Sequence, residues 1–498
     1  MSRFQPLSIR LRTVTGRAEQ IRSVSTTLRA LCLAALLLSA LSAGRATPAQ
    51  AQDDPSEVIA KAEAPSSPAW LDDAVIYEIF TRSFSPEGNF HGITARLDAL
   101  QKLGVNVLWI MPVSPTGTDR RLGRLGSPYS LRDYYAIDPA YGTKADFTAL
   151  IEAAHQRHMR VVLDMVADHT SWDSVMMKHP EFYQHDKSGK IISPHGWNDV
   201  AGLDYANPAL RQYMNDMFVY WLQTFHLDGF RCDAASFVPT DFWEQLRPKL
   251  KGIRPDVLLL AEASKPELMR SAFDLDYGWP LLATLNRVIE QGQPATSIQE
   301  DIAEQVKKFP VGTRHMLVSD DHDERRATVR YGIHGALAAS ALVFTLPGVP
   351  MLYSGMEVGD ATESGGPELF DKVDVDWSAA AEFRNVPRFY QALLALRASS
   401  PALRQGSLTW LHNSDEQHVV TFLRSTAGET VLVAVNLSNT PFRGSVEVNS
   451  ETGAATWQQV PLDQSLDKNK PNEVNALPAL SLDAFNVRIF RHLDPSAR

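Results

Sequence analysis

The chain has 498 residues, of which 44% are hydrophobic, 9% aromatic and 21% charged, so it holds enough apolar material for more than one globular domain. Its 48 Lys and Arg against 58 Asp and Glu give a formal net charge of −10 at pH 7. An acidic chain without basic runs is a poor nucleic-acid binder, and this class of partner is excluded.

The N-terminal 51 residues differ in composition from the rest. They contain seven Arg and one acidic residue, Glu19, and then the apolar run ALCLAALLLSALSAG at 30–44. The run is too short to span a bilayer comfortably, and Ala-Gln-Ala at 49–51 fits a signal-peptidase site. Residues 1–51 therefore predict a signal peptide and export to the periplasm or the outside of the cell. An uncleaved anchor is the alternative.

The predicted mature chain has features of a soluble exported protein. Cys232 is its only cysteine, so no intramolecular disulfide is expected. Outside the N-terminal segment, no stretch is long and apolar enough to cross a membrane. Residues 52–68 are polar and rich in proline, which predicts a linker.

From Ala69 onward, short apolar runs alternate with helical patterns. Helices are expected at 93–104, 144–158 and 209–225. Strands are expected at 74–80, 105–113, 159–166, 227–233, 256–262, 271–277 and 314–320, and in the apolar run 335–346 that leads into 348–353. About eight strand–helix units in this order predict a closed parallel barrel, the (β/α)8 TIM barrel, over residues 69–398.

Two segments depart from this alternation. The connection between the third and fourth strands is too long for a βα-loop and predicts a small subdomain inserted at about 171–208. After residue 398 the runs alternate apolar and polar residues with turns between them, as in HVVTFLRS at 418–425. This pattern predicts an antiparallel β-sandwich domain over 399–498.

Charged clusters stand where four of the expected strands end. These are DMVADH at 164–169, GFRCD at 229–233, LLLAE at 258–262 and SDDHD at 319–323. A single acid at a strand end usually caps a loop. In a TIM barrel, however, the carboxyl ends of the strands meet on the face that carries the active site. Four clusters at strand ends are therefore the strongest functional signal in the chain.

The four clusters resemble, in order and spacing, the signature segments of the α-amylase family of glycoside hydrolases (family thirteen). The segments AVIYEIFTRSFS at 74–85, GSPYSLRDYYAIDPAYGTKADF at 126–147 and GVPMLYSGMEVG at 348–359 are also similar to that family. The resemblance extends from about Ala69 to His492 and points to an exported bacterial-type member. It implies an enzyme that hydrolyses α-1,4-linked glucans or maltooligosaccharides, with an oligo- or polysaccharide as its partner.

The resemblance implies three catalytic carboxyls. Asp233 would be the nucleophile, Glu262 the general acid/base and Asp323 the stabiliser of the transition state. Retaining glycosidases hold their two reacting carboxyls about 5–5.5 Å apart. Asp233 and Glu262 follow consecutive strands, whose ends in a barrel give about that spacing. A covalent glycosyl-enzyme intermediate and retention of the α-configuration are expected.

Four further residues would bind the substrate or support the nucleophile. His169 and His322 would bind hydroxyls of the reacting sugar, and Tyr129 would stack on its ring. Arg231 lies two residues before Asp233, on the same face of the strand. It is expected to lower the pKa of Asp233 and keep it charged.

Three functional alternatives stay open. The same scaffold could serve an α-glucan transglycosylase, an exo-acting α-glucosidase or a non-catalytic carbohydrate-binding relative. Ser236 and Phe237 stand where many endo-acting members have Lys-His, which removes one indication of long starch chains. No cofactor is required for the reaction. A calcium ion at Asp168 is an alternative, although Gly202 stands where members often have an Asp ligand.

Two other groups of residues need an interpretation. His179, His185 and His195 are interpreted as surface polar residues, since their intervals do not match a zinc site. Asp321 stands where the family usually has Asn. Two alternatives stay open: if ionised beside the pocket it would raise the pKa of nearby acids, or it is turned away and paired, with Arg325 or Arg326 as the candidate partner.

Overall fold

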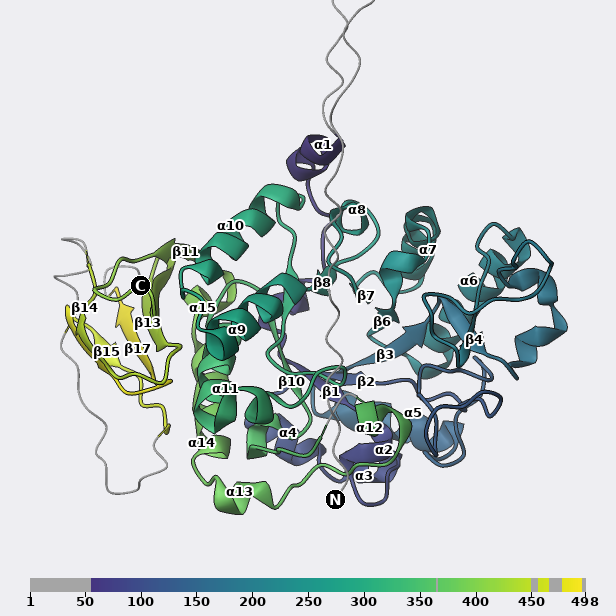
Figure 1. The fold of residues 1–498 in the computed structure, drawn as a ribbon, viewed down its shortest axis with the longest axis horizontal. Helices are drawn as coiled ribbons and strands as arrows, with labels where there is room; N and C mark the ends of the chain where they lie inside the picture. The colour runs from purple at the N-terminus through teal and green to yellow at the C-terminus, as the bar shows by residue number, and fades with distance from the viewer. Residues whose placement is uncertain (1–54, 364–365, 449–455, 465–476, 495–498) are drawn as a thin grey trace, which may run out of the picture. The chain divides into compact units, whose positions relative to one another are not determined.

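A computed structural model describes residues 55–363, 366–448, 456–464 and 477–494 of the chain (Figure 1). The predicted signal peptide, 1–51, lies outside these residues. No helix in the described ranges is long and apolar enough to span a membrane.

Eight parallel strands close into a barrel, which confirms the predicted (β/α)8 fold (Figure 1). Their order around the barrel is β1-β10-β9-β8-β7-β6-β3-β2. The strands are β1 (Ile76–Ile79), β2 (Val107–Ile110), β3 (Arg160–Val166), β6 (Gly229–Asp233), β7 (Leu258–Ala261), β8 (Leu275–Tyr277), β9 (His315–Leu317) and β10 (Val349–Tyr353). The barrel closes where β1 pairs with β10, with Ile76 opposite Met351.

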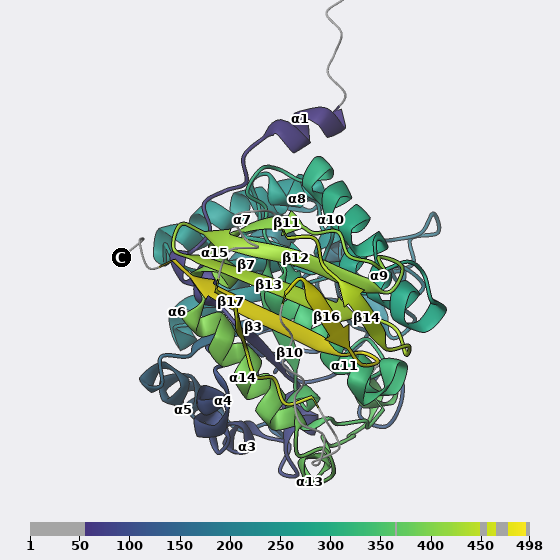
Figure 2. The same ribbon diagram turned by 90° about the vertical axis from the view of Figure 1, so that its left-hand side faces the viewer.

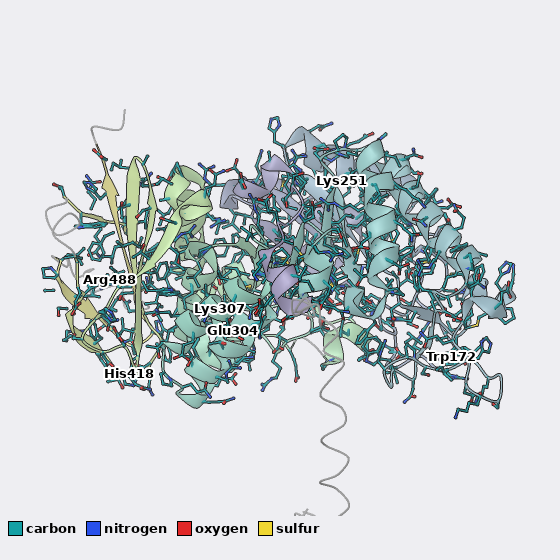
Figure 3. All side chains as sticks on the ribbon, turned by 90° about the horizontal axis from the view of Figure 1, so that it is seen from above. Trp172, Lys251, Glu304, Lys307, His418 and Arg488 are labelled. Carbon is teal, nitrogen blue, oxygen red and sulfur yellow. The ribbon has the colours of Figure 1, made fainter. Side chains whose placement is uncertain are left out.

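Helices surround the barrel and follow its strands. They are α1 (Pro55–Lys61), α2 (Thr81–Phe84), α3 (Phe90–Thr94), α4 (Leu97–Leu103), α5 (Lys144–Gln156), α6 (Pro208–Phe225), α7 (Thr240–Ile253), α8 (Pro266–Met269), α9 (Trp279–Gln291), α10 (Ser297–Lys308), α11 (Ala327–Thr345), α12 (Gly366–Phe370), α13 (Ala379–Glu382), α14 (Val386–Ser399) and α15 (Pro401–Gln405). Short 3-10 helices are η1 (Ala69–Asp73), η2 (Val175–Lys178), η3 (Pro180–Phe182), η4 (Ala235–Phe237) and η5 (Met356–Val358). Figure 3 shows the charged Glu304 and Lys307 on α10.

Capping residues explain where the predicted helices begin and end. Helix α4 ends at Gly104, whose φ of 108° is a left-handed conformation that suits glycine. Helix α5 begins with a capping box formed by Thr143 and Asp146. Helix α6 begins after Asn207, whose side chain accepts a hydrogen bond from Ala209 N.

Two expectations for local structure are wrong. Residues 335–345, grouped with the last strand, belong to helix α11. A continuous apolar run does not distinguish a buried strand from a buried helix, and its alanines favour the helix. The predicted linker 52–68 contains helix α1, and the residues after it are tied to the barrel by Ala64 N, which donates to Val311 O.

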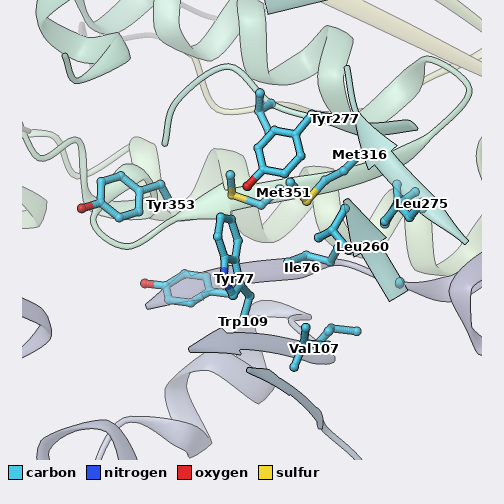
Figure 4. Close-up of a cluster of buried hydrophobic side chains, with 14 of the residues drawn as sticks. Ile76, Tyr77, Val107, Trp109, Leu260, Leu275, Tyr277, Met316, Met351 and Tyr353 are labelled. Carbon is cyan, nitrogen blue, oxygen red and sulfur yellow. The ribbon is translucent and has the colours of Figure 1, made fainter. Parts of the chain in front are cut away.

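The barrel interior is filled by side chains from neighbouring strands. Ile76, Trp109, Leu260, Met316 and Met351 are at most 1% exposed and gather in one cluster (Figure 4). A parallel barrel is covered on both sides, so its strands are apolar throughout rather than alternating. The packed interior fixes the strand ends on which the site is built.

The inserted subdomain follows β3 as predicted. Strand β4 (His169–Ser171) pairs antiparallel with β5 (Val200–Gly202), with His169 opposite Gly202. Helix α6 then leads back to β6. The insertion therefore begins and ends beside the carboxyl ends of two neighbouring barrel strands.

The C-terminal region forms two antiparallel sheets, which confirms the predicted sandwich (Figure 2). One sheet has the order β11-β12-β13-β17-β15 and the other pairs β14 with β16. The strands are β11 (Ser407–Trp410), β12 (Val419–Thr426), β13 (Glu429–Asn436), β14 (Phe442–Ser445), β15 (Gln458–Gln459), β16 (Ala479–Leu482) and β17 (Val487–Leu493). Leu432, Phe442, Leu482 and Phe490 belong to one buried cluster contributed by both sheets.

Asp228, just before β6, joins neighbouring elements at the amino end of the barrel. Its carboxylate accepts hydrogen bonds from Val161 N (2.8 Å) and His155 Nε2 (2.7 Å) and pairs with Arg254 Nη2 (2.6 Å). Burial alone would raise the pKa of Asp228, but these contacts outweigh it and the pKa is lowered. The ionised form is therefore part of the folded structure.

We predict that Asp228→Asn lowers the free energy of unfolding by about 2 kcal/mol at pH 7, because the partners of the buried carboxylate lose their acceptor charge. The difference should shrink below about pH 4, since the stabilisation by a carboxylate with a lowered pKa disappears as it is protonated. Urea denaturation measures both values. Asp256→Asn is the matched control: Asp256 also pairs with Arg254, but its side chain is 48% exposed. A loss as large in the control would contradict the assignment.

Candidate active site

The carboxyl ends of the strands surround a cavity of about 440 Å³. Six of the seven predicted site residues line it: Tyr129, His169, Asp233, Glu262, His322 and Asp323. The seventh, Arg231, lies beneath it with a fully buried side chain. The barrel therefore brings together all seven predicted site residues.

A larger cavity, of about 1000 Å³, lies beside the amino ends of β9 and β10 and extends to β11. Two of its lining side chains form ion pairs: Arg314 pairs with Asp72, and His315 pairs with Asp276 behind it. The smaller cavity has the convergent carboxyls that bond cleavage needs. We therefore assign the active site to the smaller cavity.

Arg231 is the centre of the site. Its Nη1 lies 3.0 Å from Asp164 Oδ1 and 3.0 Å from Asp233 Oδ1, and its Nη2 lies 3.1 Å from Glu262 Oε2. Its Nε donates to Tyr277 Oη at 3.1 Å. Arg231 and Asp233 share a face of β6 because alternate residues of a strand point the same way. One buried cation thus contacts carboxyls from β3, from β6 and from the residue that follows β7.

Arg231 acts on the pKa of Asp233 in the expected direction, lowering it, but it does not decide the net shift. Burial raises the pKa of Asp233, the negative charge of Glu262 raises it further, and Arg231 opposes both without cancelling them. Burial likewise raises the pKa of Asp164 to about 6 against the charges of Arg231 and His322. One guanidinium does not offset the burial of Asp164 and Asp233, so the pKa of both carboxyls lies above that of an exposed Asp.

Glu262 is fixed by the residue that follows the predicted nucleophile. Its Oε2 accepts a hydrogen bond of 2.7 Å from Ala234 N. Ala234 has φ 47° and ψ 34°, a left-handed conformation that is unfavourable for a residue other than glycine. This strained turn brings the N–H of Ala234 to Glu262, so the positions of Asp233 and Glu262 are coupled through backbone.

His322 connects two more acids to the site. Its Nδ1 is hydrogen-bonded to Glu78 of β1, and its Nε2 lies 2.8 Å from Tyr129 Oη and 3.4 Å from Asp323 Oδ2. Burial alone would lower the pKa of His322, but Asp323 and Glu78 raise it well above its ordinary value. Tyr129 stacks on His322, with ring centroids 5.3 Å apart, and donates to Asp164 Oδ2 at 3.1 Å.

Sequence reasoning missed Glu78 and Asp164 as site residues. Asp164 was noted at a strand end but received no role. Glu78 is an acid inside the apolar run of the first strand, and its side chain is fully buried. A buried acid in such a run needs a partner, and this was the available signal.

His169 and His195 share Asp168 as a partner. Asp168 Oδ2 lies 3.3 Å from His169 Nδ1 and 3.2 Å from His195 Nε2. His195 is exposed, as the sequence interpretation has it, and it also contacts Asp168. Calcium takes oxygen ligands, whereas Asp168 Oδ2 lies against two imidazole nitrogens, and Gly202 O accepts a hydrogen bond from Gln184 N.

Asp321 caps its own loop. Its Oδ1 accepts hydrogen bonds of 3.0 Å from Asp323 N and from Glu324 N, so of the two alternatives the pairing with Arg325 or Arg326 is wrong. An aspartate that bonds the backbone two and three residues ahead forms a local turn, and this geometry directs it away from both arginines. Burial and the charge of Asp323 raise the pKa of Asp321 well above its ordinary value.

We predict that Asp321→Asn stabilises the fold, because the amide oxygen keeps the acceptor position while the buried charge is removed. A raised carboxyl pKa means that the folded state binds the proton more tightly than the unfolded state, so stability is lost as pH rises above about 4. The gain should be near zero at pH 4 and about 1 kcal/mol or more at pH 8. Thermal unfolding at both pH values tests this. A gain that is equal at both would contradict it.

Comparison with known families and proteins agrees with this geometry. The family model described as the α-amylase catalytic domain matches residues 72–197 and 194–392. The alpha-amylase MalA of Haloarcula japonica is 30% identical over 400 residues, which cover 75% of this chain and 57% of that protein. A cyclomaltodextrinase of a Bacillus species is 26% identical over 424 residues, which cover 74% and 73% of the two chains. The chain thus spans little more than half the length of MalA.

Two solved structures with a similar fold are also alpha-amylases. The maltogenic alpha-amylase AmyB of Thermotoga neapolitana superposes with a TM-score of 0.74 at 27% identity, over 85% of this chain and 98% of that one. An alpha-amylase of Lactobacillus plantarum gives a TM-score of 0.73 at 30% identity, over 85% and 99%. With the family model matching more than half of the sequence, the chain belongs to the α-amylase family.

Proposed function

We propose that the chain is a retaining glycoside hydrolase that cleaves α-1,4-linked glucans or maltooligosaccharides. One observation carries this assignment: Asp233 and Glu262, on neighbouring strand ends, contact the same buried guanidinium and line the same cavity. The printed names of the relatives (alpha-amylase, cyclomaltodextrinase and maltogenic alpha-amylase) support the substrate class. All three carboxyls are present at the cavity, which argues against a non-catalytic relative.

The first step forms a covalent intermediate. Asp233 attacks the anomeric carbon, and the bond from that carbon to the leaving oxygen breaks as Glu262 gives this oxygen a proton. Asp323, whose side chain is 43% exposed, stabilises the positive charge that develops at the anomeric centre. Arg231 and Ala234 N hold the two reacting carboxyls in place during this step.

The second step releases the sugar. Glu262 takes a proton from water, the water oxygen attacks the anomeric carbon, and the bond to Asp233 breaks. Two inversions give net retention of the α-configuration.

His169 and His322 line the cavity as donors to hydroxyls of the reacting sugar, and Tyr129 contributes its ring. A sugar hydroxyl in place of water would give transfer, so product analysis at high substrate concentration distinguishes the two outcomes.

We also propose that the protein is exported. The support is the basic and apolar pattern of residues 1–51 and the Ala-Gln-Ala sequence at 49–51. N-terminal sequencing of the protein recovered from the periplasm or the medium tests this. A mature N-terminus at Gln52 is expected.

We predict that Asp233→Asn and Glu262→Gln each lower hydrolysis of a 4-nitrophenyl α-maltooligosaccharide by roughly 10³-fold or more, because each removes a group that acts in the transition state. Thermal unfolding shows whether the variants are folded. NMR of the wild-type products should show the α-anomer first. Near-normal rates in either variant, or a β-product, would contradict the mechanism.

The raised pKa of Asp233 predicts a pH dependence. Since the nucleophile must be ionised, kcat/KM should fall as pH drops through that pKa, at a higher pH than an ordinary Asp near 3.9 would give. Asp164 contributes to the raised value. Asp164→Asn should therefore move the acid limb of the profile to lower pH, by about half a unit or more.

A matched control distinguishes this shift of the acid limb from a general effect of removing a buried carboxyl. Asp320→Asn changes another buried carboxyl, whose pKa burial also raises to about 6 and whose Oδ2 accepts from Ala327 N. Asp320 does not contact Arg231 or Asp233 in the described structure, so the acid limb should stay in place. An acid limb that moves equally in both variants would contradict the role of Asp164.

A further inference from the structure

Glu78 is a buried acid that the proposed mechanism does not use. It lies in β1, between Tyr77 and Ile79, and its side chain is fully buried. Its Oε1 is hydrogen-bonded to Nδ1 of His322, and its Oε2 has no hydrogen-bond partner in the described part of the chain. A carboxyl removed from water costs free energy that only its partners offset. The contact with His322 therefore accounts for an acid inside this apolar strand.

The imidazole of His322 is held between two aromatic rings. Tyr129 stacks on it, with ring planes at 25°, and Trp109 meets it edge to face, with ring centroids 5.8 Å apart and planes at 77°. The His322 side chain is itself buried. This packing fixes which nitrogen faces which partner: Nδ1 faces Glu78, and Nε2 faces Tyr129 and Asp323.

The hydrogen bonds at Asp164 fix the direction of the bond between His322 and Tyr129. Asp164 Oδ2 lies 3.1 Å from Trp109 Nε1 and 3.2 Å from Arg231 Nη1, both of which can only donate. This oxygen is therefore an acceptor, and the single proton of the Tyr129 hydroxyl goes to it, at 3.1 Å. Tyr129 Oη must then accept, at 2.8 Å, from Nε2 of His322. It follows that Nε2 carries a proton.

Besides the proton on Nε2, Glu78 and Nδ1 of His322 share a second proton. Either the carboxylate accepts it from a charged imidazolium, or the carboxyl donates it to a neutral ring, and Nε2 keeps its own proton in both cases. Burial lowers the pKa of His322, but the charges of Asp323 and Glu78 outweigh burial and raise it well above its ordinary value. The charged form, with a proton on each nitrogen, is therefore favoured. Without the acid, a neutral ring could carry its single proton on either nitrogen.

We propose that Glu78 is a positioning residue, which keeps Nε2 of His322 protonated so that it donates to a hydroxyl of the reacting sugar. His322 lines the cavity and Glu78 does not, so Glu78 acts only through the imidazole. The same Nε2 lies 3.4 Å from Asp323 Oδ2, which places the proposed stabiliser of the transition state beside the donor. The contact with a sugar hydroxyl rests on the proposed function, whereas the state of the imidazole does not.

The state of the imidazole can be tested without a substrate. A proton on nitrogen in a short hydrogen bond to a carboxylate resonates downfield of the amide protons in the ¹H NMR spectrum. One such resonance of the wild-type protein should be lost in His322→Gln, and the same resonance should be lost in Glu78→Gln. Glu357→Gln is the matched control, since Glu357 is also a buried acid and is tied to β1 by Tyr77 Oη at 2.5 Å; the resonance should remain. A resonance that depends on His322 and survives in Glu78→Gln would overturn the proposal.

Kinetics with a 4-nitrophenyl α-maltooligosaccharide test the positioning role. Glu78→Gln should lower kcat/KM about ten-fold or more, because a charge-assisted donor is lost. Since Glu78 acts through His322, Glu78→Gln should cause no further loss in a chain that already carries His322→Gln. Glu357→Gln should leave kcat/KM near the wild-type value, and thermal unfolding shows that the variants are folded.

Two outcomes have different meanings. Losses that multiply in the variant carrying both Glu78→Gln and His322→Gln would show general damage to the barrel and overturn the positioning role, with the proposed hydrolase left in place. A wild-type protein that does not hydrolyse the substrate would instead overturn the proposed function, and the NMR comparison would still decide whether Glu78 sets the state of His322.

Discussion

The buried guanidinium of Arg231 is the interaction on which the site depends. A charge removed from water inside a barrel costs several kcal/mol unless partners surround it. Here the partners come from three neighbouring strand ends and include the proposed nucleophile and acid. The strand register that lets Arg231 keep its charge is therefore the same register that sets the two reacting carboxyls. The same contacts therefore hold the barrel strands in register and place the two reacting carboxyls.

The contacts around this centre leave an excess of negative charge. Within the described residues, only two cationic groups face the four acids of the site: Arg231 and the imidazole of His322, whose pKa is raised. The four acids are Glu78, Asp164, Asp233 and Glu262. Burial raises the pKa of Asp164 and of Asp233. Burial and the neighbouring acids therefore outweigh Arg231 at both of these carboxyls.

The sequence predicted most of the fold and the side chains that meet at the candidate site, because both are encoded in local segments. Each barrel strand is a short apolar run, and each strand end carries its own charged residues, as in GFRCD and LLLAE. Contacts between distant segments were not predictable. Nothing near His195 indicates Asp168, and nothing near Glu78 indicates His322. The pKa of Asp233 was predicted from its neighbour Arg231 alone, while burial and Glu262, which depend on the closed barrel, decide its direction.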